Sequence, residues 1–168
     1  MNKQEIIKQI RNLLTELEEL KESLELEDHN FKINSSGWKK ITVDEEEYLE
    51  NPKKDIWELL GEEAKGEQLF TFKAMKRETK KAGKTVPTDE QFILLLHSKK
   101  DMPNLKLTGT RNTNGSFDYL SSHAYFWSSA ISGSTAWYRY LYASNTTVIR
   151  FAGDQTNGFS VRCLKDNK

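Results

Sequence analysis

From Tyr125 to Leu164 the chain reads Y-F-W-S-S-A-I-S-G-S-T-A-W-Y-R-Y-L-Y-A-S-N-T-T-V-I-R-F-A-G-D-Q-T-N-G-F-S-V-R-C-L. Side chains alternate in character from residue 136 to 142, which is the period of a β-strand. A polar segment, 143–146, follows as a predicted turn, and a second alternating run comes after it. We therefore expect a hairpin with two different faces.

One predicted face carries an aromatic stripe, made of Tyr138, Tyr140, Tyr142, Ile149 and Phe151. The other carries Trp137, Arg139, Leu141, Val148 and Arg150. By pattern alone the stripe is the core face of the hairpin, and a binding surface is the alternative interpretation.

Composition limits the classes of function. The formal net charge is zero, which does not favour a general binder of nucleic acid or of membrane surfaces. The single cysteine, Cys163, excludes an intrachain disulfide and alternates with Phe159 and Val161, as a small buried residue does. No signal peptide or long apolar run is present, so we expect no membrane insertion and a cytoplasmic or virion-associated protein.

Residues 3–27 contain neither Gly nor Pro and show a heptad pattern. Positions a and d are occupied by Ile6, Ile10, Leu13, Leu17, Leu20 and Leu24, and Ile7 and Leu14 at e widen the apolar seam. Glu16 at g and Lys21 at the following e form the kind of pair that parallel coiled coils use between chains. We expect residues 1–28 to be a coiled-coil helix that makes the protein a homo-oligomer of three or four chains. The alternative is an amphipathic helix that lies on its own domain.

The segment between this helix and the hairpin predicts several short elements. A first strand is expected at Trp38–Val43, and an acidic helix over Asp44–Leu60, interrupted at Asn51-Pro52. Residues 67–81 begin like a strand and become a helix that Gly83 ends. Thr88 and Gln91 form a predicted capping box for another helix, and residues 112–115 form a predicted turn. Helices followed by short strands indicate the α+β class.

A search for chemistry returns no catalytic pattern. The three histidines, His29, His97 and His123, are far apart and have no metal-type spacing. No phosphate-binding loop, dinucleotide fingerprint or nucleophile elbow is present. We expect no cofactor, no metal and no enzymatic activity.

The C-terminal blocks resemble the FISUMP-type C-type lectin fold, a group that includes the variable proteins of diversity-generating retroelements. The resemblance covers residues 66–168 and is carried by these segments: Gly109-Thr110-Arg111, Gly115-Ser116-Phe117, Tyr125-Phe126-Trp127-Ser128-Ser129, Ala136-Trp137-Tyr138-Arg139 and Gly158-Phe159-Ser160-Val161-Arg162-Cys163. With the N-terminal helix set apart, it implies a C-type lectin-like ligand-binding domain over residues 29–168.

The resemblance also implies a variable region, residues 126–162, that error-prone reverse transcription rewrites at template adenines. The aromatic stripe would then be an exposed variable face that binds an unidentified ligand, which we expect to be a protein. The implied ligand-binding residues are Ile131, Thr135, Tyr138, Tyr140, Tyr142, Ser144, Ile149, Phe151, Ala152, Gly153, Asp154 and Gln155. Adenine mutagenesis of Asn codons reaches most of these residue types, whereas Gln155 needs a Lys codon in the template. The implied scaffold residues are Trp127, Trp137, Arg139, Arg150 and Arg162.

Three other functions remain as alternatives. The same fold is similar to that of formylglycine-generating enzymes, whose activity relies on a pair of cysteines, and this chain has one. Calcium-dependent sugar lectins carry Glu-Pro-Asn and Trp-Asn-Asp motifs, which are absent here. An undiversified phage-type adhesin or lectin is the third alternative.

Overall fold

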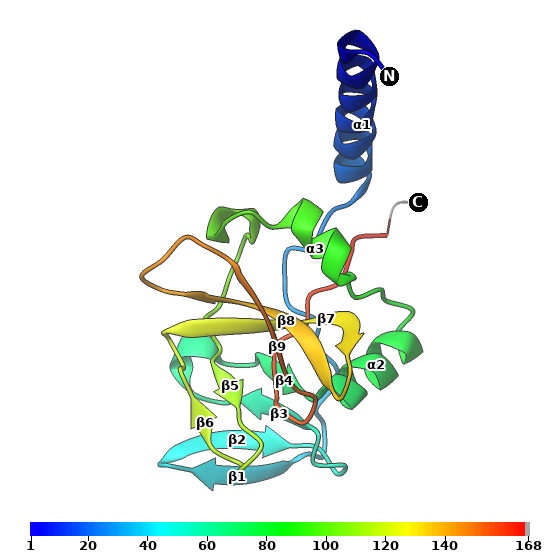
Figure 1. Ribbon diagram of the computed structural model, residues 1–168. Helices are drawn as coiled ribbons and strands as arrows, with labels where there is room; N and C mark the ends of the chain where they lie inside the picture. Colours follow the sequence, from blue (N-terminus) through cyan, green and yellow to red (C-terminus); the bar gives the residue numbers. More distant parts are fainter. Residues whose placement is uncertain (167–168) are drawn as a thin grey trace.

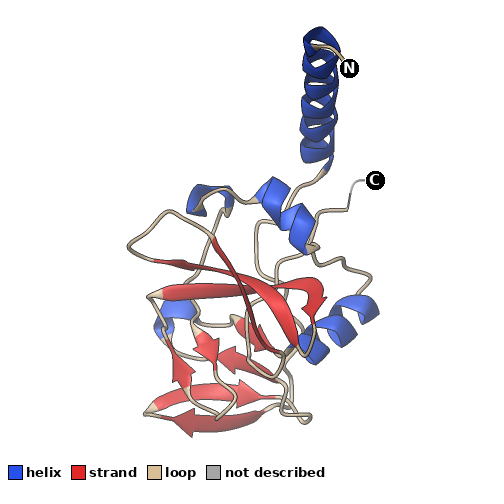
Figure 2. Ribbon diagram, in the orientation of Figure 1, coloured by secondary structure: helices blue, strands red, loops and turns tan. Residues whose placement is uncertain are grey.

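The computed structural model describes residues 1–166 and shows a mixed α+β protein (Figure 1). An N-terminal helix, α1 (Lys3–Ser23), projects from a body of antiparallel sheets and short helices (Figure 2). The α+β class predicted from the sequence is confirmed. No helix in residues 1–166 has both the length and the apolar character needed to cross a membrane.

Helix α1 begins with a capping box between Asn2 and Glu5, in which each side chain accepts a hydrogen bond from the other residue's backbone. All of its residues are exposed. The apolar residues at its a, d and e positions therefore keep between 39% and 59% of their surface in solvent: Ile6, Ile7, Ile10, Leu13, Leu14, Leu17 and Leu20. The helix does not lie on its own body, so this apolar seam has no partner within the described chain.

The body begins directly after α1. Leu26 is buried and forms an antiparallel bridge with Leu164. The backbone N–H of Glu27 donates to the carbonyl of Cys163 at 2.9 Å, and that of Lys165 donates to the carbonyl of Glu25 at 2.7 Å. These ladder bonds attach the end of α1 to the C-terminal segment.

The first sheet contains β1 (Lys39–Val43), β2 (Glu46–Glu50), β3 (Ile56–Leu59) and β4 (Gln68–Phe70), in that order. The predicted acidic helix over residues 44–60 is wrong. Asp44 and Glu45 have positive φ angles of 49° and 71° and form the two-residue turn of a β1–β2 hairpin. Tyr48 of β2 is buried with Trp57 and stacks on Phe117 at 3.8 Å. Burial of these aromatic rings outweighs the helix propensity of the acidic residues.

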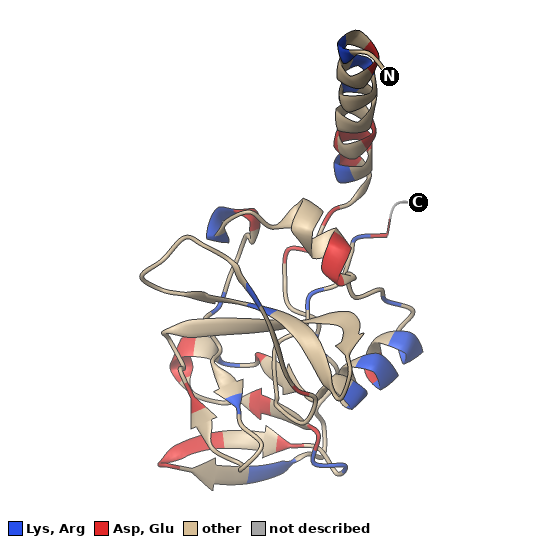
Figure 3. Ribbon diagram, viewed as in Figure 1, with Lys and Arg blue, Asp and Glu red and all other residues tan. Residues whose placement is uncertain are grey.

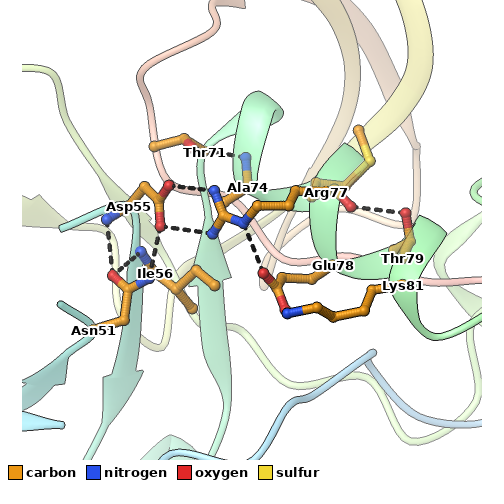
Figure 4. A network of polar contacts seen from close by, with 10 residues as sticks. Asn51, Asp55, Ile56, Thr71, Ala74, Arg77, Glu78, Thr79 and Lys81 are labelled. Atoms are coloured by element: carbon orange, nitrogen blue, oxygen red, sulfur yellow. Dashed lines mark hydrogen bonds and ion pairs between the residues drawn. The ribbon is translucent and has the colours of Figure 1, made fainter. Parts of the chain in front are cut away.

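Helix α2 (Phe72–Lys81) is joined to this sheet by a charged network (Figure 4). The guanidinium of Arg77 donates to both carboxylate oxygens of Asp55, at 2.7 and 3.1 Å, and its Nε donates to Glu78 at 2.7 Å. The side chain of Asn51 accepts from the backbone N–H of Asp55 at 2.8 Å and donates to its carboxylate at 2.7 Å. The predicted termination by Gly83, which has a φ of 69°, is confirmed.

The remaining short elements follow the predicted local signals. Thr88 and Gln91 form the predicted capping box of α3 (Asp89–Leu95). Residues 112–115 connect β5 (Thr110–Arg111) to β6 (Phe117–Asp118). Two 3-10 turns, η1 (Glu62–Ala64) and η2 (Lys99–Asp101), complete this part of the body.

The third sheet contains β7 (His123–Ser132), β8 (Thr135–Tyr142) and β9 (Ile149–Asp154), which confirms the predicted hairpin. It lies between two apolar clusters. Trp127, Ala136 and Phe159 belong to a cluster with α2, whereas Phe126 and Leu141 belong to a cluster with α3. Leu26 belongs to the α3-side cluster, so α1 leaves the body on that side of the sheet.

Candidate functional site: an aromatic face on the three-stranded sheet

Cross-strand pairing assembles the predicted stripe on one face of the sheet. Tyr140 lies between Tyr125 of β7 and Ile149 of β9, and Tyr138 lies between Trp127 and Phe151. His123 pairs with Tyr142 at the far end. Directly opposed residues share a face of a sheet. We use "aromatic face" for seven residues: His123, Tyr125, Tyr138, Tyr140, Tyr142, Ile149 and Phe151.

Exposure changes along the aromatic face. Phe151 keeps 57% of its surface in solvent, whereas Tyr138 packs against the α2-side cluster, with its ring 4.6 Å from that of Phe159. The expectation that the whole stripe is exposed is therefore wrong: among its five residues only Phe151 is exposed, and the other four, Tyr138, Tyr140, Tyr142 and Ile149, are half-buried. Pattern could not show this, because the ring that covers Tyr138 comes from a segment 21 residues away.

Tyrosine rings make up a continuous contact network across β7 and β8. Tyr125 stacks on Tyr140 at 5.6 Å and on Phe159 at 5.1 Å, and Tyr140 contacts Tyr142 at 5.6 Å. Burial raises the pKa of the Tyr125 hydroxyl above its ordinary value. A hydrogen bond with Tyr142 and, secondarily, burial raise the pKa of Tyr140 to about 12. These hydroxyls are therefore neutral donors and acceptors at physiological pH.

The structure brings some predicted binding residues to this face and leaves others elsewhere. The face contains Tyr138, Tyr140, Tyr142, Ile149 and Phe151, and the register continues it toward Gly153 and Ile131, which both pair with Ala136. Ile131 is 52% exposed. Thr135, Ala152 and Asp154 occupy register positions of the opposite face, and Ser144 and Gln155 lie in loops after β8 and β9.

Gly153 and Tyr138 are coupled by close packing. A Cβ atom built on Gly153 would lie 2.8 Å from the Cε1 atom of the Tyr138 ring. Any larger residue at position 153 therefore requires the Tyr138 ring to move. Gln155 is tied to the same end of the sheet, because its side-chain amide donates to the carbonyl of Thr135 at 3.3 Å.

Three further aromatic residues belong to the face or lie at its edge, and they were not predicted from the sequence to be binding residues. His123 and Tyr125 are on β7, and their alternation with Trp127 is a signal that could have identified them. Tyr119 is 53% exposed, and its ring lies 4.4 Å from that of His123. Burial lowers the pKa of His123, and its Nδ1 atom shares a 2.8 Å hydrogen bond with the hydroxyl of Ser122.

The backbone at Tyr119 is strained. Its φ angle is 65°, in the left-handed region that costs a bulky residue energy. The carbonyl of Tyr119 accepts hydrogen bonds from the N–H groups of Ser122 at 3.0 Å and His123 at 2.9 Å, which hold this conformation. The backbone of Gly109 packs closely against this turn. A Cβ atom at position 109 would lie 2.2 Å from the carbonyl oxygen of Asp118, so the position requires glycine.

A buried carboxylate fixes the opposite face of the sheet. Asp89, at the start of α3, accepts from Arg139 of β8 at 2.9 Å and from Arg150 of β9 at 2.7 Å. The guanidinium of Arg150 lies 3.4 Å from the ring centroid of Trp137. Trp137 is thus on the predicted face, but it is only half-buried and packs beneath Arg150 instead of entering a core cluster.

Chemically reactive groups do not gather on the aromatic face. Cys163 is 1% exposed, and burial raises the pKa of its thiol to about 12. His29 and His97 are exposed and remote in sequence from the sheet. Across residues 1–166, no three His, Cys, Asp or Glu side chains form a group that could hold a metal ion.

Comparisons with known protein families, with curated proteins and with solved structures give no match to this chain.

Proposed function

We propose that this protein is a non-enzymatic ligand-binding protein on a C-type lectin-like fold, and that its aromatic face is the binding surface. The observation that carries the proposal is the aromatic face itself. Tyrosines supply large contact area at low side-chain entropy, and their hydroxyls form adaptable hydrogen bonds, as in antibody paratopes. Phe151 on β9 and the neighbouring Ile131 on β7 keep 57% and 52% of their surface in solvent, and no segment within the described chain covers them.

We further propose that this face is diversified by a retroelement reverse transcriptase. The support is the resemblance of residues 66–168 to variable proteins and the residue types on the face. Tyr138, Tyr140, Tyr142, Ile149 and Phe151 all belong to the set that adenine mutagenesis of Asn codons can produce. The burial of Cys163 and its raised thiol pKa weigh against the formylglycine-generating alternative, since that chemistry needs a reactive thiolate.

The flanking DNA tests the diversification proposal. We expect a near-copy of the segment that encodes residues 126–162 close to a reverse transcriptase gene. The two copies should differ mainly at template adenines in codons of the aromatic face. Flanking DNA without such a copy would contradict diversification, and the undiversified adhesin would become the better interpretation.

We also propose that α1 makes the protein a homo-oligomer. Seven exposed apolar residues on one seam of α1 have no intramolecular partner within the described residues, and helix association would bury them. Linked binding sites gain avidity through effective concentration, which suits a face that was not optimised for one ligand.

Sedimentation equilibrium tests the oligomer. The full chain should sediment as an oligomer, and Leu13→Glu at position d should sediment as a monomer. Thr15→Glu, on the outward side of the same helix, is the matched control and should remain associated. A monomeric full chain at micromolar concentration would rule out this role for α1.

A further inference from the structure

The two halves of α1 carry opposite charge. The N-terminal half contains Lys3, Lys8 and Arg11 with one acid, Glu5. The C-terminal half contains four acids and one base: Glu16, Glu18, Glu19, Glu22 and Lys21. Figure 3 shows this separation along the projecting helix. All of these side chains are exposed, and within residues 1–166 no ion pair with the body engages them.

Opposite charge on the two halves favours helices that run in opposite directions. We infer that α1 associates with a second copy of itself in antiparallel orientation, so that the basic half of each helix lies beside the acidic half of its partner. This inference rests on the oligomerisation proposed above. It deepens that proposal by assigning the relative direction of the helices and an even number of chains to the assembly.

The apolar seam supports an antiparallel register. In an antiparallel pair, a positions of one helix lie opposite d positions of the other, which places Ile10 opposite the partner's Leu20, so that positions adding to about 30 oppose one another. Leu13 then meets Leu17 and Ile6 meets Leu24, so each apolar a position lies opposite an apolar d position. The same register places Lys8 and Arg11 beside the partner's Glu22 and Glu19.

A parallel arrangement of the helices makes the interactions between these charges less favourable. It gains the pair between Glu16 at g and Lys21 at e, but it brings like-charged halves together. It also places Lys3, at an a position, against its own copies. The macrodipoles of adjacent parallel helices repel, whereas those of antiparallel helices attract.

Antiparallel pairing fixes where the binding surfaces lie. Each new helix must be matched by one of opposite direction, so the assembly contains an even number of chains. A 21-residue helix is about 30 Å long, which separates the bodies at the two ends of the bundle. Because α1 leaves the body on the α3 side of the sheet, the aromatic faces turn away from the bundle.

Disulfide trapping distinguishes the two orientations. The full chain is prepared separately as Ile10→Cys and as Leu20→Cys with different affinity tags, and the two are mixed under mild oxidation. A disulfide forms only where Cα atoms come within about 7 Å. Antiparallel helices should give the mixed disulfide that joins position 10 of one variant to position 20 of the other, whereas parallel helices should give the two homodimers. The natural Cys163 is 1% exposed and should not exchange.

Charge reversal gives an independent readout. The triple substitution Lys3→Glu, Lys8→Glu, Arg11→Glu makes both halves acidic and should weaken association by about tenfold or more, since several attractive pairs become repulsive. Adding Glu16→Lys, Glu18→Lys, Glu19→Lys and Glu22→Lys restores opposite halves and should restore association. Wild-type association should weaken as salt rises, because screening removes the attraction.

The outcomes separate this inference from the proposed function. A mixed disulfide, together with a sedimentation mass that corresponds to an even number of chains, supports antiparallel pairing. Homodimeric disulfides, or a trimer by sedimentation, overturn the orientation while the oligomer stands. A monomeric wild type overturns both, and none of these results alters the binding role of the aromatic face.

Discussion

Tyr138 and Phe151 are cross-strand partners whose rings lie 6.1 Å apart, and their surroundings differ. Tyr138 rests on Trp127 and Phe159, whereas Phe151 is 57% exposed. Leu141, on the opposite face of β8, is completely buried. The three residues therefore sample a half-buried, an exposed and a fully buried position in one small sheet.

Alanine substitution should rank these three positions by burial. Leu141→Ala should lower the free energy of unfolding by about 2–5 kcal/mol, and Phe151→Ala should change it by about 0.5 kcal/mol or less. Tyr138→Ala should fall between them, at about 2 kcal/mol, since its ring is partly solvated. Urea denaturation midpoints measure all three. A Phe151→Ala loss as large as that of Leu141→Ala would show that the exposed end is core.

Asp55 gives a pH dependence with a definite sign. Burial alone would raise its pKa, but hydrogen bonds from Arg77 and Asn51 hold it below its ordinary value. A carboxyl with a lowered folded-state pKa contributes stability above its unfolded value near pH 4, and this stability is lost as pH falls through the folded-state pKa. Stability should thus fall from about pH 4 downward. Asp55→Asn should be less stable at neutral pH and should show a shallower fall, which denaturation at a series of pH values measures.

At the scale of elements, β9 is the edge strand of its sheet and pairs only with β8 among the described strands. Arg150 anchors it through the ion pair with Asp89 and the contact with Trp137. The same carboxylate holds Arg139 of β8. One buried side chain at the start of α3 therefore fixes both β8 and β9, which carry most of the proposed variable residues.

Removing the charge of Asp89 should loosen this edge. Asp89→Asn leaves Arg139 buried without its counter-charge and should cost about 3 kcal/mol of folding stability. Hydrogen exchange at backbone amides of residues 149–154 should accelerate more than exchange in β1 and β2. Arg150→Ala, which leaves the buried Asp89–Arg139 pair in place, is the milder comparison. Equal exchange in all strands would mean that Asp89 has no special role at this edge.

Local signals predicted the elements that local interactions control. The α3 capping box, the Gly83 helix end and the β8–β9 hairpin each depend on residues within a few positions. The first strand of the β1–β2 hairpin was predicted and is confirmed, but its turn and β2 were predicted as helix, because β2 is stabilised by Tyr48 packing on Phe117, 69 residues away. The candidate site was predicted only in part for the same reason. Alternation gave the stripe, whereas Phe159, from a later segment, covers Tyr138 and leaves its cross-strand partner Phe151 exposed.

At the scale of the whole molecule, the two sides of the β7–β9 sheet have different neighbours. The α3 side carries the buried Asp89 pair and the root of α1, and the other side carries the aromatic face. Trp127 and Ala136 on the aromatic side also belong to a core cluster, so the fold depends on both sides of the sheet. The proposed oligomer depends on the α3 side, and the proposed ligand binding depends on the solvent-accessible part of the aromatic face. The central claim is that the aromatic face tolerates sequence change and binds.

A paired display library tests that claim most directly. One library randomises Ile131, Tyr140, Tyr142, Ile149 and Phe151, and a matched library randomises Ala124, Phe126, Arg139, Leu141 and Val148 on the opposite face. The readouts are the fraction of variants that resist protease and the fraction that bind an immobilised globular test protein. We predict that most aromatic-face variants fold and that selection yields specific binders, whereas opposite-face variants mostly unfold. Unfolding of both libraries to the same extent, or folded aromatic-face variants that never yield a binder, would contradict this claim.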